Sequence, residues 1–325
     1  MKKAIISGVA GQDGSYLADL LIEKGYEVHG IVRPESIEST QKLGNIAHLN
    51  RNFILHPIGL ENQLALVKVI QTVQPDECYH LASSSFVNYA VDAEVSIMQN
   101  NFVSTYNLLS TLKEICPNCR VYFAGSSEMF GQVGISPQDE ETPFNPRSIY
   151  GISKLAGYHL ARNYREQNGI FVCTGILFNH ESHRRGMEFV TRKITLAAAR
   201  IKTGMDKTVR LGNLEAVRDW GYAPEYVEAM WRMLQQSEPM DYVIATGKLH
   251  SVKEFLDIAF GSLGLDYEDY VISDPTFYRP SETVPLCGSS LKAETLLGWK
   301  PQKCFSEMVQ EMVEYDYKEL LGGQK

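Results

Sequence analysis

The stretch from Lys3 to Val32, KAIISGVAGQDGSYLADLLIEKGYEVHGIV, decides the fold. It reads as an apolar strand, a glycine-rich turn, an amphipathic helix and a second strand. Gly8, Gly11 and Gly14 give the spacing G-x-x-G-x-x-G. Glycines in such a turn let the backbone approach a pyrophosphate at the helix N-terminus, where free N–H groups and the helix dipole favour negative charge. The stretch therefore predicts the first unit of a dinucleotide-binding sheet.

The second predicted strand ends at Val32 and is followed directly by Arg33. A site for NAD usually has an acidic residue here for the ribose 2′-hydroxyl, whereas an arginine suits a 2′-phosphate. Arg33 therefore favours NADP over NAD, although the nearby Glu35 keeps NAD open.

Strand and helix patterns continue to alternate through the first half of the chain. The apolar runs NFILHPI, ECYHLA, VYFAG and IFVCTGILF are separated by helical patterns. This order is typical of an α/β fold with a doubly wound parallel Rossmann sheet. We expect the cofactor-binding Rossmann domain to comprise residues 1–175 plus about 213–240. A smaller, mixed α/β substrate domain is expected in 176–212 and 241–325, where it closes over the mouth of the sheet.

Composition limits the partners and the compartment. The 325 residues carry a formal net charge of −8, which argues against nucleic acid or a general membrane surface as a partner. The N-terminal MKKAIISG lacks the apolar segment of a secretory signal, and no apolar run approaches the roughly 20 residues of a membrane span. We therefore expect a cytoplasmic protein. Six cysteines are too few for a disulfide scaffold, Cys116-Pro-Asn-Cys119 is interpreted as a turn before the strand VYFAG, and no metal site is expected.

Four polar side chains gather around the strand VYFAG and the helix that is predicted after it. Ser126 and Glu128 come just past the strand, and in extended backbone their spacing of two directs both side chains to one side. Tyr150 and Lys154 stand four apart on the predicted helix YGISKLAGYHLARNYREQ and so share one face. A lysine ammonium beside a tyrosine stabilises the phenolate and lowers the phenol pKa, which enables proton transfer near neutral pH. The alternative is a Tyr and a Lys at this spacing by chance.

With a nicotinamide cofactor, Tyr150, Lys154 and Ser126 can oxidise a substrate alcohol. Glu128 adds a base that can take the proton α to the new ketone, so that a hydroxyl one carbon further leaves as water and the hydride is returned. The result is a 4,6-dehydration without net redox change. The alternatives are a glutamate without a chemical role, as in an epimerase or a simple dehydrogenase, and a non-catalytic binding protein on this fold.

A polar, basic loop follows the strand IFVCTGILF. The loop segment HRRGMEFVTRKI holds four basic side chains, an unusual cluster in an acidic protein: Arg184, Arg185, Arg192 and Lys193. They form either a solvated charged face or a set of phosphate ligands, for which arginine offers a planar fork of donors. Arg218 is expected in a later loop, and Arg279 in an extended segment before a proline.

Three serines, Ser83 to Ser85, follow the strand ECYHLA. They are either a plain loop or a set of cofactor and sugar contacts near the point where the strand order reverses. Asn101, on the next predicted helix, faces the same region if that helix packs against the central strand, and otherwise only packs.

The chain resembles the extended short-chain dehydrogenases/reductases, and within them the GDP-mannose 4,6-dehydratase family. The similarity covers nearly the whole length and is most specific in GQDGSYLADLLIEKGYEVHGIVR, SSEMFG, YGISKLAGYH, FNHESHRRGMEFVTRKIT and LGNLEAVRDWGYAPEYVEAMW. It implies an NADP-dependent oxidation at C4 of GDP-mannose, loss of water across C5 and C6, and re-reduction at C6, giving GDP-4-keto-6-deoxy-mannose. It also implies a homodimer or homotetramer.

The glycine turn and the resemblance together assign the site residues. The catalytic residues are Ser126, Glu128, Tyr150 and Lys154; the cofactor-binding residues are Gly8, Gly11, Gln12, Asp13, Gly14, Arg33, Tyr150, Lys154, His180 and Arg185; and the substrate-binding residues are Ser85, Asn179, Lys193, Arg218 and Arg279.

The chain departs from the family pattern at three places. Two arginines and serines are usual after the second strand, where this chain has Arg33-Pro34-Glu35-Ser36; Gly-Asp-Leu is replaced by Gly59-Leu60-Glu61; and Ala-Gln-Ser-His beside the sugar is replaced by Ser83-Ser84-Ser85-Phe86. Loss of the Gln and the His beside the hexose leaves a related substrate open, for instance GDP-manno-heptose, as well as a GDP-sugar epimerase or dehydrogenase.

Overall fold

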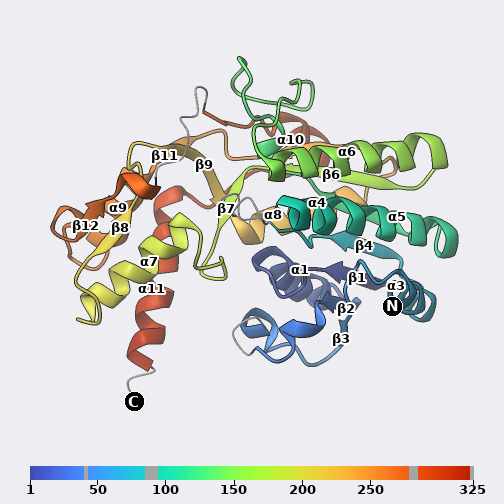
Figure 1. Ribbon diagram of the computed structural model, residues 1–325, viewed down its shortest axis with the longest axis horizontal. Coiled ribbons are helices and arrows are strands. Elements are labelled where there is room, and N and C mark those ends of the chain that lie inside the picture. The colour runs from blue at the N-terminus through green and yellow to red at the C-terminus, as the bar shows by residue number, and fades with distance from the viewer. Residues whose placement is uncertain (40–42, 85–93, 278–284, 323–325) are drawn as a thin grey trace.

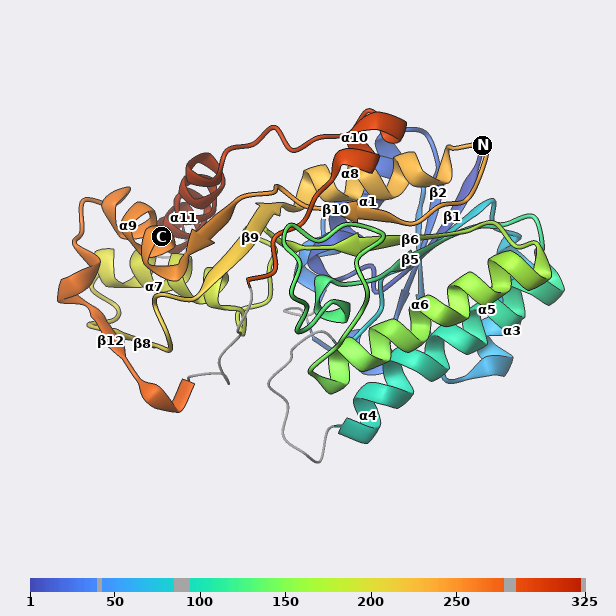
Figure 2. The same cartoon turned by 90° about the horizontal axis from the view of Figure 1, so that it is seen from above.

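The computed structural model describes residues 1–39, 43–84, 94–277 and 285–322. These residues form a larger part built on one broad sheet and a smaller part beside it (Figure 1). Strands β7 (Asn179–Glu181) and β9 (Val217–Tyr222) run between the two parts. The view from above shows helices on both sides of the broad sheet, which makes the larger part a three-layer structure (Figure 2).

The larger part is centred on a parallel sheet whose seven described strands have the order β10-β6-β5-β4-β1-β2-β3. The strands are β1 (Lys3–Ser7), β2 (Glu27–Val32), β3 (Phe53–Pro57), β4 (Glu77–His80), β5 (Arg120–Ala124), β6 (Val172–Leu177) and β10 (Tyr242–Ile244). In β1, Ala4 and Ile6 face one helix layer and Ile5 faces the other, and all three are fully buried. Burial on both faces explains why the strands read as continuous apolar runs. The order reverses between β1 and β4, so a crevice is expected at their carboxyl ends.

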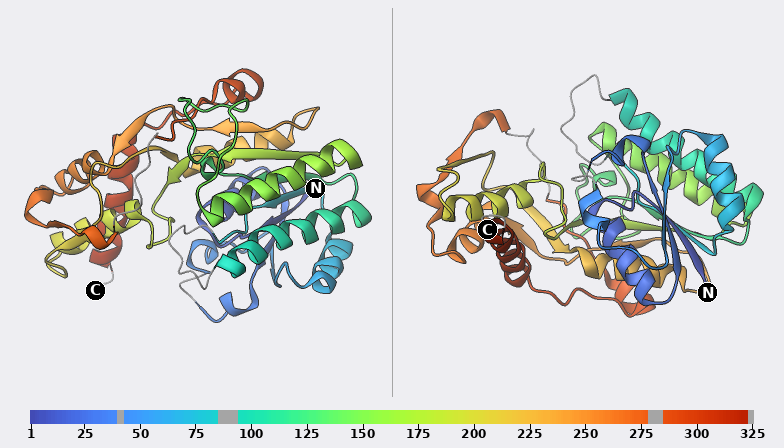
Figure 3. Two further views of the ribbon diagram at one scale, coloured as in Figure 1. Left: turned by 45° about the horizontal axis from the view of Figure 1, so that its top comes forward. Right: turned by 90° about the horizontal axis from the view of Figure 1, so that it is seen from below.

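Helices cover both faces of this sheet, as the two further views make plain (Figure 3). One layer contains α3 (Gln63–Val73), α4 (Glu94–Met98), α5 (Ser104–Ile115) and α6 (Ile149–Asn168); the other contains α1 (Gln12–Glu23), α8 (Ala223–Leu234) and α10 (Leu291–Leu297). The helix that was predicted to carry Asn101 is present as α4 and α5, joined by a π-helical turn (Gln99–Val103). The doubly wound α/β prediction is confirmed.

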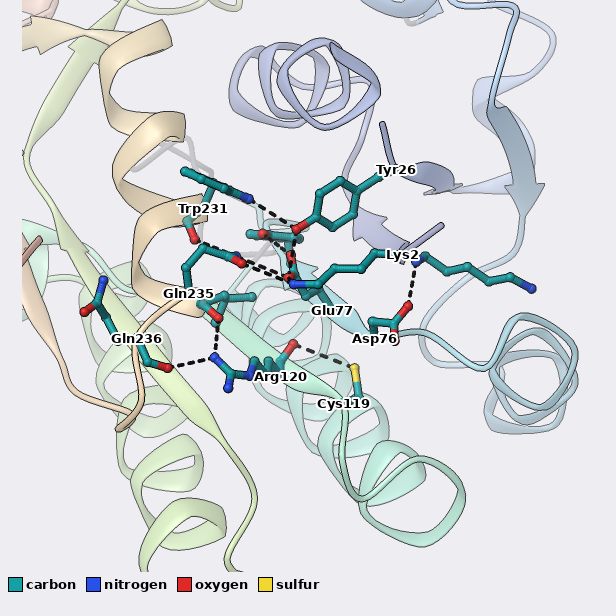
Figure 4. Close-up of polar contacts among 12 residues, drawn as sticks. Lys2, Tyr26, Asp76, Glu77, Cys119, Arg120, Trp231, Gln235 and Gln236 are labelled. Atoms are coloured by element: carbon teal, nitrogen blue, oxygen red, sulfur yellow. Dashed lines mark hydrogen bonds and ion pairs between the residues drawn. The ribbon is translucent and has the colours of Figure 1, made fainter. Parts of the chain in front are cut away.

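A buried carboxylate ties several elements together at the amino ends of the strands (Figure 4). Glu77 accepts hydrogen bonds from Lys2 Nζ at 2.9 Å, Tyr26 OH at 3.0 Å, Tyr79 OH at 2.7 Å and Gln235 Nε2 at 3.2 Å. Buried charges persist where several donors satisfy them. This network, at the sheet edge opposite the crevice, connects β4 to the start of β1, the start of β2 and the end of α8.

The Cys116–Cys119 segment forms a turn between α5 and β5, in which the Cys119 N–H donates to the Cys116 carbonyl at 2.9 Å. All six cysteines are free. Among the residues that the structure describes, no group of His, Cys, Asp and Glu has an arrangement suited to a metal ion. No described helix is long and apolar enough to cross a membrane.

The smaller part has its own core. Its elements are the three-stranded sheet β11-β9-β7, the strand pair β12-β8 and three helices: β11 (Leu249–Ser251), β8 (Val209–Leu211), β12 (Val271–Ser273), α7 (Val190–Lys202), α9 (Val252–Gly261) and α11 (Phe305–Gly322). Buried Trp220, Phe255 and Met312 lie at the meeting of β9, α9 and α11. Arg218, expected in a loop, lies instead in strand β9, paired opposite His250 of β11.

The predicted borders differ from those in the structure. Strand β10 and helix α10 fall in the predicted substrate region 241–325, yet both pack into the larger part, because Ile244 and Leu297 are buried against α1 and α8. Conversely, β9 falls in the predicted segment 213–240 but pairs with β7 and β11 of the smaller part. The chain crosses between the parts more often than the prediction allowed.

Candidate active site

The glycine turn between β1 and α1 has the close backbone contacts that a phosphate loop requires. Gly8 has φ +74°, and a Cβ there would lie 2.9 Å from the backbone of Ala82. A Cβ on Gly14 would lie 2.3 Å from the Gly8 carbonyl oxygen. Gly11 is the N-cap of α1 and supplies no side-chain hydrogen bond, which leaves N–H groups of the first turn for a ligand. The turn therefore fits a dinucleotide pyrophosphate.

A cavity of about 300 Å³ opens beside this turn at the carboxyl ends of β1, β2 and β4. Its lining includes Gly8, Gly11, Ile31, Val32, Arg33, Ser36, Leu60, Glu61, Ala82, Ser83, Ser84, Asn100 and Ser104. The Ser83 hydroxyl is buried without a hydrogen-bond partner in the described structure. A buried, unpartnered hydroxyl in a polar cavity is suited to a polar ligand. Arg33 is exposed at this cavity, so its guanidinium is free to reach a phosphate there.

Gln12, Asp13 and His180 were predicted to bind the cofactor. They lie together, and their side chains form hydrogen bonds mainly with one another. Gln12 Nε2 donates to Asp13 Oδ1 and to the His180 carbonyl, at 3.0 Å each, and His180 Nε2 lies 2.8 Å from Asp13 Oδ2. Burial disfavours the imidazolium, but the Asp13 carboxylate outweighs this and raises the pKa of His180. The side-chain oxygen Oε1 of Gln12 in turn accepts from Ser182 Oγ at 2.9 Å. This buried network joins the first turn of α1 to strand β7.

Ser126 and Glu128 lie at the end of β5, but the extended backbone expected between them is wrong. Ser126 is the N-cap of a 3-10 turn, Ser127–Met129, and its hydroxyl accepts from the Glu128 N–H at 3.2 Å. The turn forms because the serine hydroxyl satisfies an N–H that has no helical partner. Helix α6 packs directly on it, since a Cβ on Gly151 would lie 2.5 Å from the Glu128 carbonyl oxygen. The Ser126–Glu128 turn and the Tyr150 turn are therefore in contact.

Tyr150 and Lys154 share one face of α6, as predicted from their spacing, and Lys154 Nζ lies 5.8 Å from the centre of the Tyr150 ring. The expected lowering of the phenol pKa by Lys154 is wrong for the protein alone. Burial raises the pKa of Tyr150 to about 12; a hydrogen bond with Ser126 and the charge of Arg185 oppose the rise, and Glu128 adds to it. Lys154 instead donates to the Ala124 carbonyl at 2.8 Å, and burial lowers its pKa to about 8.

The two neighbouring arginines of the basic loop have different surroundings. Arg184 is bound to helix α1, because its Nη1 donates to Asp19 at 2.7 Å and to Ser15 at 3.2 Å. Arg185 lies over the Phe189 ring at 3.7 Å. Of these two arginines, Arg185 is the one whose charge is among the main influences on the pKa of Tyr150. Arg184 thus anchors the basic loop to α1, whereas the charge of Arg185 acts on the predicted catalytic residue Tyr150.

Three of the five predicted substrate residues lie among the described residues of the smaller part. Asn179 and Arg218 are on the neighbouring strands β7 and β9, where Trp220 is the register partner of Asn179. Lys193 is on α7 and donates to the Arg210 carbonyl at 2.7 Å. Ser85 and Arg279 lie outside the described residues.

Sequence reasoning left one further site residue undecided. Asn101 is buried in the π-helical turn; its Oδ1 accepts from the Ser84 N–H at 2.8 Å, and its Nδ2 donates to Ser153 Oγ at 2.9 Å. Ser153 in turn donates to the Tyr150 carbonyl at 2.7 Å. Asn101 therefore links the serine segment to the Tyr150 turn. A π-helical turn inserts one residue per turn and so changes the direction of a side chain, which a regular 3.6-residue pattern did not foresee.

The glycine turn, the Ser126–Glu128 turn and the helix that carries Tyr150 and Lys154 thus lie at the carboxyl ends of the strands of a doubly wound sheet. The family model described as GDP-mannose 4,6 dehydratase matches residues 5–312. The chain belongs to the GDP-mannose 4,6-dehydratase family.

Curated relatives of this family come from plants, animals and bacteria. GDP-mannose 4,6 dehydratase 2 of Arabidopsis thaliana is 48% identical over 97% of this chain and 87% of its own. The Homo sapiens GDP-mannose 4,6 dehydratase is 44% identical over 96% and 91% of the two chains, and the Vibrio cholerae GDP-mannose 4,6-dehydratase is 41% identical over 98% and 94%.

Solved structures support the fold. A dTDP-glucose 4,6-dehydratase of Bacillus anthracis in complex with NAD has a TM-score of 0.84 at 19% identity, covering 98% of this chain and 97% of that chain. The RMD of Pseudomonas aeruginosa, complexed with NADPH, has a TM-score of 0.80 at 21% identity, covering 98% and 100%.

Proposed function

We propose that this chain converts GDP-mannose to GDP-4-keto-6-deoxy-mannose, with NADP as its cofactor and with Ser126, Glu128, Tyr150 and Lys154 as the catalytic residues. The family establishes the reaction class: the chain is a nucleotide-sugar 4,6-dehydratase, a hydro-lyase. The observation that carries the residue assignment is the contact between the Ser126–Glu128 turn and the first turn of α6.

In this proposal the protein residues perform the proton transfers. Tyr150, hydrogen-bonded to Ser126, takes the proton of the C4 hydroxyl. Glu128 takes the proton at C5, which the C4 ketone acidifies, and gives it to the C6 hydroxyl, which leaves as water. When hydride has returned to C6, Tyr150 gives the proton that it took from the C4 hydroxyl to C5, which restores the phenolate. NADP, held by the glycine turn and by Arg33, would supply the redox chemistry, a reversible exchange of hydride with the sugar. Lys154, held at the Ala124 carbonyl, places a cation at the phenol-bearing face of α6.

NADP is preferred to NAD in the proposal because Arg33 lines the cavity beside the glycine turn, where it can pair with a 2′-phosphate. Asn179, Lys193 and Arg218 are proposed to hold the GDP-sugar from the smaller part. The family resemblance adds a homodimer or homotetramer to the proposal, which light scattering after size exclusion measures directly.

The test is product formation by Glu128→Gln. The wild type, given NADP and GDP-mannose, is expected to form a product that is lighter by one water, whereas Glu128→Gln should bind NADP normally and form none. Glu141→Gln is the matched control, because Glu141 is exposed in the neighbouring loop. Unchanged turnover by Glu128→Gln would remove Glu128 from the mechanism. A wild-type product of unchanged mass would instead indicate an epimerase, and faster turnover of GDP-manno-heptose would reassign the sugar.

A further inference from the structure

We propose that Glu181 is a positioning residue: it holds the guanidinium of Arg185 in place and so fixes a positive charge that acts on Tyr150. The proposal rests on the function proposed above. It adds a residue that neither the glycine turn nor the Ser–Glu–Tyr–Lys set includes.

Glu181 is a buried acid at the end of β7, with only 1% of its surface exposed. Its Oε2 accepts a hydrogen bond from Thr191 Oγ1 at 2.6 Å, and Thr191 is itself buried in the first turn of α7. A carboxylate near a helix N-terminus is stabilised by the free N–H groups and the dipole there. Strand β7 therefore holds the backbone of Glu181, and helix α7 holds its carboxylate through Thr191.

The same oxygen forms an ion pair with Arg185, since Glu181 Oε2 lies 3.3 Å from Arg185 Nε. Phe189 supports the guanidinium from another side, with the ring centre 3.7 Å from Cζ. In the part of the chain that the structure describes, Glu181 is the one ion-pair partner of Arg185. Removing Glu181 therefore removes the ion pair that orients the guanidinium and leaves it with the Phe189 ring and a longer-range attraction to Asp13.

The position of Arg185 matters because few charges face Tyr150. Glu128 from the 3-10 turn and Asp13 from α1 are negative and raise the pKa of Tyr150, whereas Arg185 lowers it. Lys154 lies on the same helix as Tyr150, but its ammonium is bound to a main-chain carbonyl. Among the main charges that act on Tyr150 from other elements of the described chain, Arg185 is thus the one that lowers the pKa of the phenol.

Two roles for Glu181 predict opposite results. If Glu181 only offsets the charge of Arg185, removing its negative charge exposes Tyr150 to a stronger cation, and the phenol pKa falls. If Glu181 positions Arg185, the guanidinium moves away when the carboxylate is lost, and the phenol pKa rises. The sign of the shift therefore separates positioning from simple charge compensation.

The experiment compares pH profiles of kcat for GDP-mannose at saturating NADP, with cofactor occupancy measured for each variant. Glu181→Gln keeps the shape and an oxygen for Thr191 but loses the charge; Thr191→Val keeps the charge but loses the hydrogen bond that orients it. We expect the acidic limb of the kcat profile to shift to higher pH by about half to one unit in Glu181→Gln. At a given pH on that limb, kcat is then about three- to tenfold lower than in the wild type. Thr191→Val should shift the limb in the same direction and by less.

Glu77→Gln is the matched control, because Glu77 is equally buried and accepts several hydrogen bonds but lies at the opposite edge of the sheet (Figure 4). It should lower the melting temperature without moving the pH profile. A downward or absent shift in folded Glu181→Gln would overturn the positioning role. Failure of the wild type to act on GDP-mannose would instead count against the proposed function. In that case a crystal structure of Glu181→Gln tests the positioning role. Displacement of the Arg185 guanidinium from the Phe189 ring supports this role, and an unchanged position of the guanidinium refutes it.

Discussion

Replacement of Gly14 by alanine tests the cofactor cradle at its tightest point. A Cβ there would lie 2.3 Å from the Gly8 carbonyl oxygen and 2.6 Å from Val9 Cα, and both atoms belong to the backbone of the turn itself. Contacts under 3.0 Å do not occur for real Cβ atoms, so the start of α1 must move away from the turn by several tenths of an ångström. Such overpacking costs about 1–3 kcal/mol, which outweighs the gain of roughly 1 kcal/mol from placing alanine in a helix.

The displacement has a larger consequence for binding than for folding. The N–H groups of the first turn of α1 are the expected donors to the pyrophosphate, and a hydrogen bond to a charged group contributes about 1.5–3 kcal/mol. Misalignment of one such bond should weaken NADP binding by about 10- to 100-fold. Isothermal titration calorimetry of NADP, with a thermal melt on the same sample, measures both effects.

Gly261→Ala is the control for this substitution, because Gly261 is the last residue of α9 and a Cβ there meets nothing within 4 Å. It should leave NADP affinity unchanged and the melting temperature equal or slightly higher. If folded Gly14→Ala bound NADP within about twofold of the wild type, the pyrophosphate would not lie at this helix terminus, and the placement of the cofactor would be wrong.

Two further predictions concern stability. Asp241→Asn should lower the melting temperature by several degrees in a thermal melt, because it breaks the paired 2.7 Å contacts that Asp241 makes with Arg165 and leaves a half-buried guanidinium uncompensated; an unchanged melt would show that the pair contributes nothing. Burial and the charge of His29 lower the pKa of His56, so the unfolded chain binds the proton more readily than the folded protein. This part of the stability is complete above the ordinary histidine pKa and is lost as the pH falls from that value through the lowered pKa of the folded protein. Urea unfolding at about pH 8 and about pH 5 should therefore show a smaller loss for His56→Gln than for the wild type, and an equal loss would contradict the assignment to His56.

The larger fold was predictable because its signals are local. Burial on both faces makes each parallel strand a short apolar run, as in KAIIS, and the glycine spacing before an amphipathic helix marks the turn. The short strand β10 was misassigned, since three residues carry too little pattern to show which sheet they join. Arg218 was expected in a loop for a similar reason: its strand β9 is half polar and is held by pairing with β7 and β11.

At the site, spacing predicted the shared face of Tyr150 and Lys154 but not the pKa of the phenol. Spacing fixes which side chains of one helix are neighbours, whereas the pKa depends on burial and on charges from α1, the 3-10 turn and the basic loop. The 3-10 turn at Ser126 was also missed, because a serine that caps a turn and a serine that ends a strand look alike in sequence.

The order of residues along the chain was enough to establish the layered α/β fold, the glycine cradle and the family, because each depends on contiguous patterns. Which of two adjacent arginines anchors a helix and which faces the phenol was settled only by folding. Arg184 and Arg185 are chemically identical and differ in what the fold places beside them: Arg184 pairs with Asp19, which is distant in the sequence, and Arg185 pairs with Glu181, four residues before it.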